Sequence, residues 1–285
     1  MKIAVLGTGI MGGAMARCAA GAGIQVVAWS RPLEDARKLE ADGVRATDTA
    51  CEAAADADIV VTMATDAEAI AGFAHDFLPS GDFVWCQCAT VGPEGCDRLA
   101  ALARNAGVTY LDAPVLGTRE PAERGELVIL ASGPDTALDR CAPFFDAVGS
   151  RTLRLGPAGN GTRLKLVVNN WIVGTVALLA EAMALADALG VDGEVFLDAI
   201  AGSAVDMGYA QVKGRMMIEG SYPVSMPLAH AAKDAGLAAA VAGRHGLEHA
   251  VTRAAAALLE RAATEDDPRD DMAAGFRVAA RRHDR

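Results

Sequence analysis

Short runs rich in β-branched and aromatic residues alternate with alanine-rich stretches over the first half of the chain, and this alternation constrains the fold most. The runs cover residues 2–7, 24–30, 58–64, 82–89, 109–115, 126–133 and 151–156. Strands that are separated by helices of about ten residues or more imply βαβ crossovers. We therefore expect a mostly parallel sheet with both faces covered by helices.

The pattern changes after Gly161, from where we expect helices and no strand. Apolar residues recur there at the spacing of one buried helical face, namely at Leu164, Val168, Ile172, Leu179, Met183 and Ala186. A helix over 161–189 would be about 43 Å long at ~1.5 Å per residue, enough to link two domains. We predict two domains, an α/β domain over 1–158 and an all-helical domain over 159–285 that includes the long helix.

Composition and charge argue against several classes of partner. The net charge of −11 argues against a nucleic-acid partner, which needs a basic stripe. The chain enters a strand directly at its start, so we expect a cytoplasmic protein without a secretion signal. We also expect no membrane span, because the longest apolar stretch, around 164–189, is interrupted by Lys165, Asn169, Asn170, Glu181 and Asp187.

The six cysteines follow neither disulfide nor metal-site spacing. The closest approach to a metal motif is "CQC" at 86–88, but it lies in the apolar, strand-like run "DFVWCQCA". We expect buried free thiols there and no metal site.

A glycine-rich turn follows the first predicted strand. In "VLGTGIMGGAM", Gly7, Gly9 and Gly12 satisfy G-x-G-x-x-G between a strand and a helix. Such glycines allow a tight turn, the approach of a pyrophosphate to the backbone and close helix packing, and the helix N-terminus then faces the phosphates. This context predicts a Rossmann-type dinucleotide site in the first domain.

The end of the second predicted strand bears on which dinucleotide binds. NAD enzymes usually place an acidic residue there to bind the ribose 2′-hydroxyl, but this chain has Ser30 and Arg31. An arginine suits the 2′-phosphate of NADP through charge-assisted hydrogen bonds. We favour NADP over NAD; a solvated surface arginine is the alternative.

Two polar residues lie one turn apart in the first half of the predicted long helix. Lys165 and Asn169 are i and i+4, so they project from one face. Burial lowers the pKa of a lysine toward the range in which it can exchange protons near neutrality, and an adjacent amide can orient a substrate. We predict a proton-exchanging lysine; the alternative is that both residues face solvent at the domain junction.

A further turn follows the run 109–115. Gly117 and Thr118 there would place backbone N–H groups at the carboxyl edge of the sheet, where ligands of such folds bind. Small anions suit that place. A plain Gly-Thr turn is the alternative.

With these motifs in this order, the chain resembles the β-hydroxyacid dehydrogenase family over nearly its whole length. "GTGIMGGAM", "CATVGPE" (88–94) and "DAPVLGT" (112–118) resemble family segments, as do "GNGTRLKLVVN" (159–169) and "MPLAHAAKDAGLA" (226–238). "MATD" (63–66) stands where the family has a loop that touches the cofactor. The stretch "LGTREPAERGELVILASG" is especially similar to the glyoxylate/succinic semialdehyde reductase branch, which prefers NADPH.

The resemblance implies hydride exchange between NADP and a small carboxylated alcohol or aldehyde. It assigns proton exchange to Lys165 and substrate orientation to Asn169. It implies that the backbone at Gly117 and Thr118 holds the substrate carboxylate, and that Leu116 and Arg119 are the other substrate-binding residues of this loop. It further implies cofactor contacts from Gly7, Gly9, Ile10, Met11, Gly12, Ser30, Arg31, Ala64, Thr65, Thr90 and Lys233. A homodimer or tetramer is usual in the family.

Three positions depart from the family pattern. Leu116 replaces a serine that donates to the substrate carboxylate, Ala89 replaces a second hydroxyl, and Met226 replaces a phenylalanine. Losing such a donor costs on the order of 1–3 kcal/mol of binding. Two other functions therefore stay open: a reductase of larger apolar ketones or imines, and a cofactor-binding protein without turnover.

Overall fold

The computed structural model describes residues 1–281, so residues 282–285 of the predicted second domain lie outside the described residues. The chain divides into two compact units, Met1–Lys165 and Leu166–Arg285. The division falls seven residues after the boundary that we placed at 158/159.

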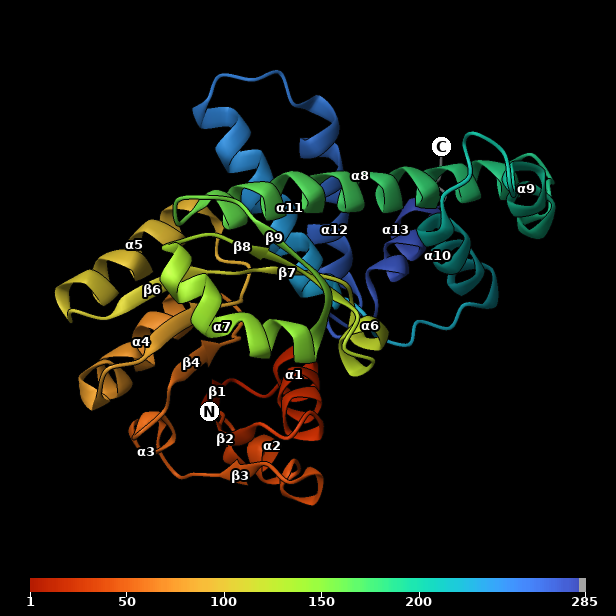
Figure 1. Ribbon diagram of the computed structural model, residues 1–285. Helices are drawn as coiled ribbons and strands as arrows, with labels where there is room; N and C mark the ends of the chain where they lie inside the picture. The colour runs from red at the N-terminus through yellow and green to blue at the C-terminus, as the bar shows by residue number, and fades with distance from the viewer. Residues whose placement is uncertain (282–285) are drawn as a thin grey trace. The chain divides into compact units, whose positions relative to one another are not determined.

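The first unit is built on six parallel strands, which confirms the predicted α/β fold class (Figure 1). Their order is β3-β2-β1-β4-β5-β6, and neighbours in this order pair in parallel. The two-residue strand β3 was not predicted. The strands are β1 (Lys2–Leu6), β2 (Gln25–Trp29), β3 (Arg45–Ala46), β4 (Ile59–Thr62), β5 (Val84–Gln87) and β6 (Thr109–Asp112).

Both faces of this sheet are covered, because successive side chains of a strand point to opposite faces. On one face, Ile3 and Val5 of β1 share a core with α1 (Ile10–Gly21) and α7 (Asp135–Val148). On the other, Ala4 and Leu6 pack with residues of three helices. These are α3 (Ala50–Ala54), α4 (Ala67–Phe77) and α5 (Gly92–Asn105). The short α2 (Leu33–Arg37) and two 3₁₀ turns, Glu40–Asp42 and Leu78–Ser80, complete this half.

The last strands of the unit form a separate sheet, which corrects our expectation that 109–115 is one strand. Asp112 ends β6, and after Pro114 the chain enters β7 (Val115–Leu116). β7 pairs antiparallel with β8 (Leu127–Ala131), which pairs in parallel with β9 (Gly149–Arg154). A proline lacks the N–H that a ladder needs, which fits the break at this position. The short α6 (Arg119–Glu123) lies between β7 and β8.

The predicted long helix is confirmed as α8 (Asn160–Ala188). Its buried face differs from the prediction in its first half: Leu164, Val168 and Ile172 are only half-buried. Leu179, Met183 and Ala186 are buried as expected, together with Val173, Val176 and Ala180.

By length and composition alone, α8 is also apolar enough to cross a membrane. Our expectation that its polar residues exclude a span therefore does not hold by that criterion. Core helices of soluble proteins pass the same test, and part of α8 lies in the core of the second unit. The absence of a membrane partner stays a prediction.

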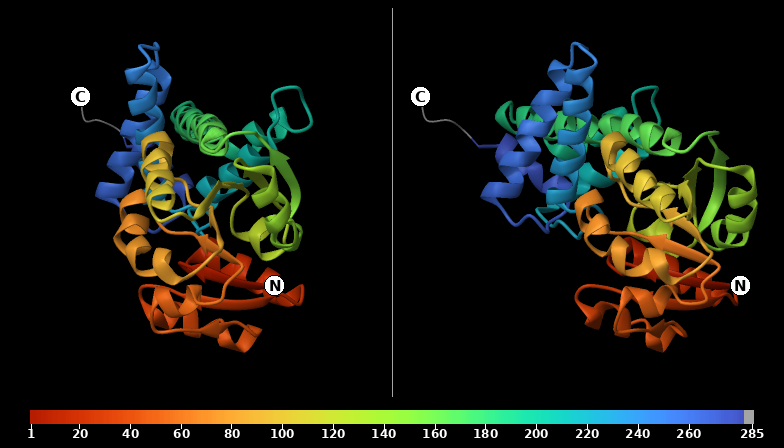
Figure 2. Two further views of the ribbon diagram at one scale, coloured as in Figure 1. Left: turned by 60° about the vertical axis from the view of Figure 1, so that its left-hand side comes forward. Right: turned by 90° about the vertical axis from the view of Figure 1, so that its left-hand side faces the viewer.

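Helices make up the second unit, as predicted; among its described residues the only β pairing is an isolated bridge between Pro227 and Asp271. α11 and α12 pack side by side (Figure 2), and the core joins apolar side chains of α8, α10, α11 and α12. After α8 come α9 (Gly193–Ile200), α10 (Gly208–Glu219), α11 (Leu228–Arg244), α12 (Ala250–Glu265), a 3₁₀ turn (Met272–Gly275) and α13 (Phe276–Ala279).

Candidate active site

In the glycine-rich turn between β1 and α1, two of the three motif glycines, Gly7 and Gly12, have a steric reason. Gly7 has φ +99°, and a Cβ there would run into the carbonyl of Met63. A Cβ on Gly12 would run into the carbonyl of Gly7, so α1 packs directly against the turn. Around the position of a Cβ on Gly9, by contrast, no atom lies within 4 Å. The backbone at Gly9 is therefore open to a ligand, as a pyrophosphate requires.

Thr8, between these glycines, has a buried hydroxyl without a hydrogen-bond partner among the described residues. Its backbone N–H donates to the Ser30 hydroxyl at 3.2 Å. A buried polar atom without a partner is costly, so this hydroxyl is suited to a polar group of a bound molecule. The turn thus fits a dinucleotide. Thr8 was not among the predicted site residues; its position inside G-x-G was the available signal.

Arg31, two residues after the end of β2, lies over two aromatic rings. Its guanidinium carbon is 5.3 Å from the Trp29 ring centroid and 5.8 Å from that of Phe73, a residue of α4. The side chain is exposed, and no carboxylate of residues 1–281 pairs with it. The rings hold the cation in place while its N–H groups stay available to an anion.

The other predicted cofactor residues of this unit also follow strands of the large sheet. Ala64 and Thr65 follow β4, and Thr90 follows β5. The order β2-β1-β4-β5 makes these strands neighbours, so their carboxyl ends, with Gly7 and Arg31, lie along one edge of the sheet. Ala64 and Thr90 are half-buried and Thr65 is exposed. Ile10 and Met11 begin α1, and both are half-buried.

The predicted carboxylate loop follows β7 and not a strand of the six-stranded sheet, which corrects its expected place. Leu116 ends β7, and Gly117 has φ +123°, where a Cβ would lie 2.7 Å from the Leu127 side chain. Thr118 precedes α6 and Arg119 begins it. Both side chains are half-buried, and within the described part of the chain Arg119 has no ion pair. The loop therefore offers a cation and a hydroxyl to an anion.

Lys165 and Asn169 both lie on α8, four residues apart and so on one face. Lys165 is half-buried, where we expected a buried ammonium, and Asn169 is buried. Lys165 is the last residue of the first unit, and Asn169 belongs to the second.

A buried carboxylate on α11 joins Asn169 to Lys233. Asn169 Nδ2 donates to Asp234 Oδ2 at 2.5 Å, and Lys233 Nζ lies 2.8 Å from Asp234 Oδ1. An ionised carboxylate only accepts, so it sets which end of the Asn169 amide faces it. Asp234 is a site residue that sequence analysis missed; its signal was the aspartate after the lysine in "KDAGLA".

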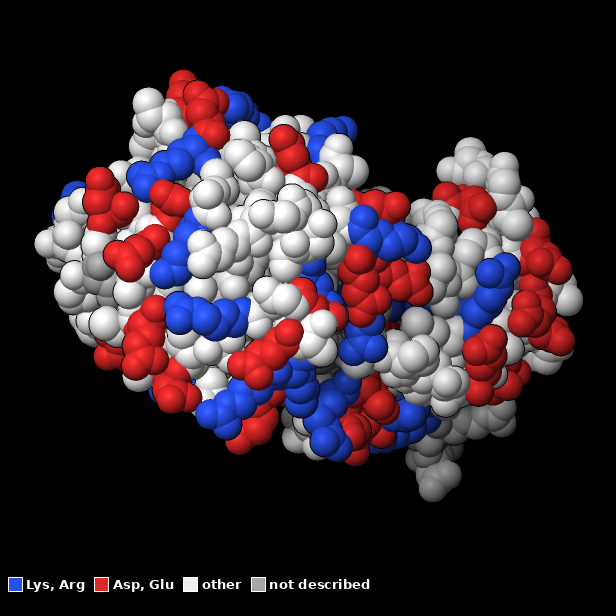
Figure 3. Space-filling view, turned by 60° about the horizontal axis from the view of Figure 1, so that its bottom comes forward, with Lys and Arg blue, Asp and Glu red and all other residues white. Residues whose placement is uncertain are grey.

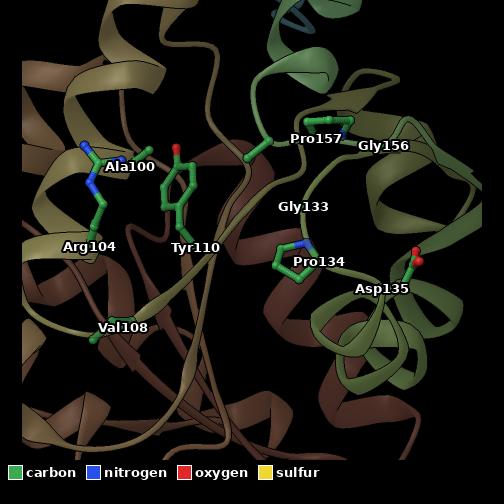
Figure 4. A pocket seen from close by; sticks show the side chains of 10 residues that line it. Ala100, Arg104, Val108, Tyr110, Gly133, Pro134, Asp135, Gly156 and Pro157 are labelled. Atoms are coloured by element: carbon green, nitrogen blue, oxygen red, sulfur yellow. The ribbon is translucent and has the colours of Figure 1, made fainter.

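An open groove of about 680 Å³ lies elsewhere in the first unit and contains none of the predicted site residues (Figure 4). Its walls include Arg104 and Tyr110 on one side and Pro134, Asp135 and Pro157 on the other. The Tyr110 hydroxyl donates to the Cys96 thiol at 3.7 Å. The groove is therefore separate from the glycine-rich turn between β1 and α1.

Neither charge on one visible face nor metal-binding groups among the described residues mark a further site. On the face drawn in Figure 3, basic side chains lie among acidic ones. No group of three or more His, Cys, Asp or Glu residues in the described part of the chain could hold a metal ion. Cys86 and Cys88 are buried free thiols, as predicted, and hydrogen bonds from neighbouring thiols together with burial raise the pKa of Cys86 well above its ordinary value.

Known proteins resemble this chain over both units. A family model described as the NAD binding domain of 6-phosphogluconate dehydrogenase matches residues 2–156. A second, described as NAD-binding of NADP-dependent 3-hydroxyisobutyrate dehydrogenase, matches residues 159–279.

Two curated relatives and one solved structure show the same likeness. The glyoxylate/succinic semialdehyde reductases 1 and 2 (chloroplastic) of Arabidopsis thaliana are 30% and 31% identical to this chain. The alignments cover 90% and 85% of it, and 90% and 69% of the relatives. The 3-hydroxyisobutyrate dehydrogenase of Mycobacterium tuberculosis, solved with L-serine, superposes with a TM-score of 0.87 at 26% identity, over 97% of this chain and 98% of that one.

Proposed function

The chain belongs to the β-hydroxyacid dehydrogenase family, a group of NAD(P)-dependent oxidoreductases, and we propose that it interconverts a small carboxylated aldehyde and its alcohol with NADP. The observation that carries the proposal is the buried Asn169–Asp234–Lys233 contact on the helical unit, with Lys165 one turn from Asn169 along α8. It brings two of the predicted site residues together around one carboxylate.

The chemistry assigned to the chain is binding, orientation and proton exchange. When bound, the nicotinamide supplies or accepts the hydride. The Lys165 ammonium gives a proton to the aldehyde oxygen during reduction, and the neutral Lys165 amine takes the proton of the alcohol during oxidation. The Asn169 amide, held by Asp234, then orients the oxygen that this proton reaches.

Support for a carboxylated substrate comes from the loop after β7 and from the relatives. Arg119 and Thr118 can hold a carboxylate although Leu116 lacks the family's hydroxyl. Glyoxylate and succinic semialdehyde, which the Arabidopsis relatives are named for, each carry one carboxylate. The apolar side chain of Leu116 supports a second candidate, a reductase of larger uncharged ketones.

A spectrophotometric screen tests the proposal. The purified chain is given NADPH and, in turn, glyoxylate, succinic semialdehyde, methylmalonate semialdehyde and uncharged aldehydes and ketones of similar size. Faster NADPH oxidation with the carboxylated compounds supports the proposal. Faster oxidation with the uncharged compounds supports the second candidate, and binding without oxidation means a protein without turnover.

Preference for NADPH is the first specific prediction. We expect Arg31→Ala to weaken NADPH binding about tenfold to a hundredfold and NADH binding much less, because it removes charge-assisted hydrogen bonds to the 2′-phosphate worth about 1.5–3 kcal/mol. The measurement is the dissociation constant of each cofactor by calorimetry. Arg37→Ala, which removes an exposed arginine paired with Asp48, serves as control. Equal weakening of both cofactors would contradict the assignment.

We also propose that the chain is a homodimer or tetramer that uses the exposed side of α8. Val167, Trp171, Leu178 and Leu185 recur there every four or seven residues, and each is more than half exposed. Apolar side chains repeated along one helix face are typical of an interface between subunits.

A charge on this side of α8 should weaken the assembly. We expect Leu178→Asp to shift the mass measured by light scattering toward the monomer, since a buried unpaired charge is costly. Val205→Asp places the same charge on another exposed valine and should leave the mass unchanged. A monomeric wild type, or an unchanged Leu178→Asp variant, would contradict the proposal.

The cytoplasmic location stays a prediction, which cell fractionation tests.

A further inference from the structure

The N-terminal turn of α8 is held by a carboxylate from a distant strand. Asp112, the last residue of β6, is completely buried. Its Oδ2 accepts from the backbone N–H of Thr162 at 2.8 Å and from that of Gly159 at 3.1 Å. Its Oδ1 accepts from the Thr162 hydroxyl at 2.7 Å. One carboxylate thus takes three donors from the segment that begins α8.

A second side chain, that of Ser132, also binds the start of α8. We call Asp112, Ser132 and the bonds that they make to residues 159–162 the anchor. Ser132 follows β8. Its hydroxyl donates to Asp112 Oδ2 at 3.0 Å and accepts from the N–H of Gly161 at 2.9 Å. A helix start leaves N–H groups without intrahelical partners, and a cap from the chain just before it usually satisfies them. Here the caps come from side chains 29 and 50 residues away in the sequence.

The start of α8 also packs closely against β8 and the end of β6. A Cβ on Gly161 would run into the carbonyl of Leu130 and lie 3.1 Å from Asp112. Burial of the carboxyl raises the pKa of Asp112, although the bonds from Thr162, Ser132 and Gly159 oppose this. Keeping a carboxylate in such a place is costly, and a local serine or threonine cap would satisfy the same amides at less cost.

We propose that Asp112, Ser132 and Thr162 are positioning residues for Lys165. Lys165 is the third residue after Thr162 and the last of the compact first unit. The anchor therefore fixes the turn that carries the lysine to β6, the neighbour of β5 in the six-stranded sheet, and to the end of β8. Loss of the anchor lets this turn fray. A displacement of about 1 Å can cost about a hundredfold in rate even when the substituted residue does not touch the substrate.

This inference rests on the proposed function, because it assumes that Lys165 exchanges the proton. Variants of Thr162 in the full chain test it. Thr162→Val removes the hydroxyl and keeps the shape and the backbone N–H. We expect kcat to fall about tenfold or more, with the NADPH dissociation constant unchanged within about twofold, because a shift of Lys165 affects proton exchange and not cofactor binding. Thr162→Ser should restore kcat. Thr175→Val, on the same helix with a hydroxyl bonded to Trp171, is the matched control and should change neither value.

A double variant separates positioning from general structure. If Thr162 acts through Lys165, Thr162→Val should not lower the residual rate of Lys165→Ala any further. Additive losses, or an equal loss of kcat and NADPH affinity, would overturn the inference. If Thr162→Val does not fold, Ser132→Ala is put through the same comparison. A Lys165→Ala variant with full activity would instead reject the proposed function, so the two failures are distinguishable.

Discussion

Replacing Lys165 with alanine is expected to lower kcat for aldehyde reduction by about a hundredfold or more while NADPH affinity stays nearly unchanged. The reason is that a positioned proton donor contributes about 10²–10⁴ in rate, and alanine leaves only water for this step. Lys165 is not among the predicted cofactor contacts. The affinity for NADPH should therefore not depend on Lys165. Steady-state kinetics and calorimetric binding measure the two quantities.

A second lysine variant serves as the control for Lys165→Ala, and added amines serve as a chemical rescue. Lys38→Ala removes an exposed lysine paired with Asp35 and should leave kcat as in the wild type. Small primary amines added to Lys165→Ala should restore part of the rate, since they supply the missing ammonium in solution. Normal turnover in Lys165→Ala would rule out the proton-transfer role.

The largest expected effect on stability comes from Asp271. This carboxylate is fully buried in the second unit and accepts from Lys213 Nζ at 2.6 Å, from the Ser225 hydroxyl at 2.9 Å and from the backbone N–H groups of Ser225, Met226 and Ala273. Asp271→Ala leaves the buried Lys213 ammonium without its anion. We expect the free energy of unfolding in urea to fall by about 3–5 kcal/mol.

A neighbouring aspartate supplies the matched control. Asp267 pairs with Arg269 on the surface, so Asp267→Ala should cost at most about 1 kcal/mol. If Asp271→Ala and Asp267→Ala lose similar free energies of unfolding, the buried pair contributes no more to stability than the surface pair does.

The effect of Asp271→Ala should depend on pH. Burial alone would raise the pKa of Asp271, but the charge and hydrogen bond of Lys213 and two backbone N–H groups lower it below 3.8. A carboxylate whose pKa falls on folding stabilises the protein above its unfolded pKa, and this stabilisation is lost as the pH falls through the folded value. The stability difference between wild type and Asp271→Ala should therefore shrink below a pH of about 4.

Local sequence pattern was enough to predict the fold class, because βαβ alternation and helical periodicity are repeated signals. The same holds for the glycine turn, where Gly7 and Gly12 have contacts that exclude side chains. The bounds of α8 were also predictable to within one residue at each end, from the run of apolar residues that begins after Gly161 and the break after Leu189.

Contacts between distant segments could not be predicted in this way. Asp234 meets Asn169 across 65 residues, and Asp112 meets Thr162 across 50, so neither pair appears in a local pattern. The strand break after Asp112 was missed because "TYLDAPV" reads as one β-rich run, although its proline was a signal. The buried side of α8 before Val173 depends on which elements pack there, which periodicity does not fix.

The most direct measurement is NADPH oxidation by the wild type and by Lys165→Ala under saturating succinic semialdehyde or glyoxylate, after NADPH binding has been measured for both. We predict equal binding, steady oxidation by the wild type and a rate lower by about a hundredfold or more for the variant. Equal rates in the two proteins, or NADPH binding without oxidation by the wild type, would contradict the account.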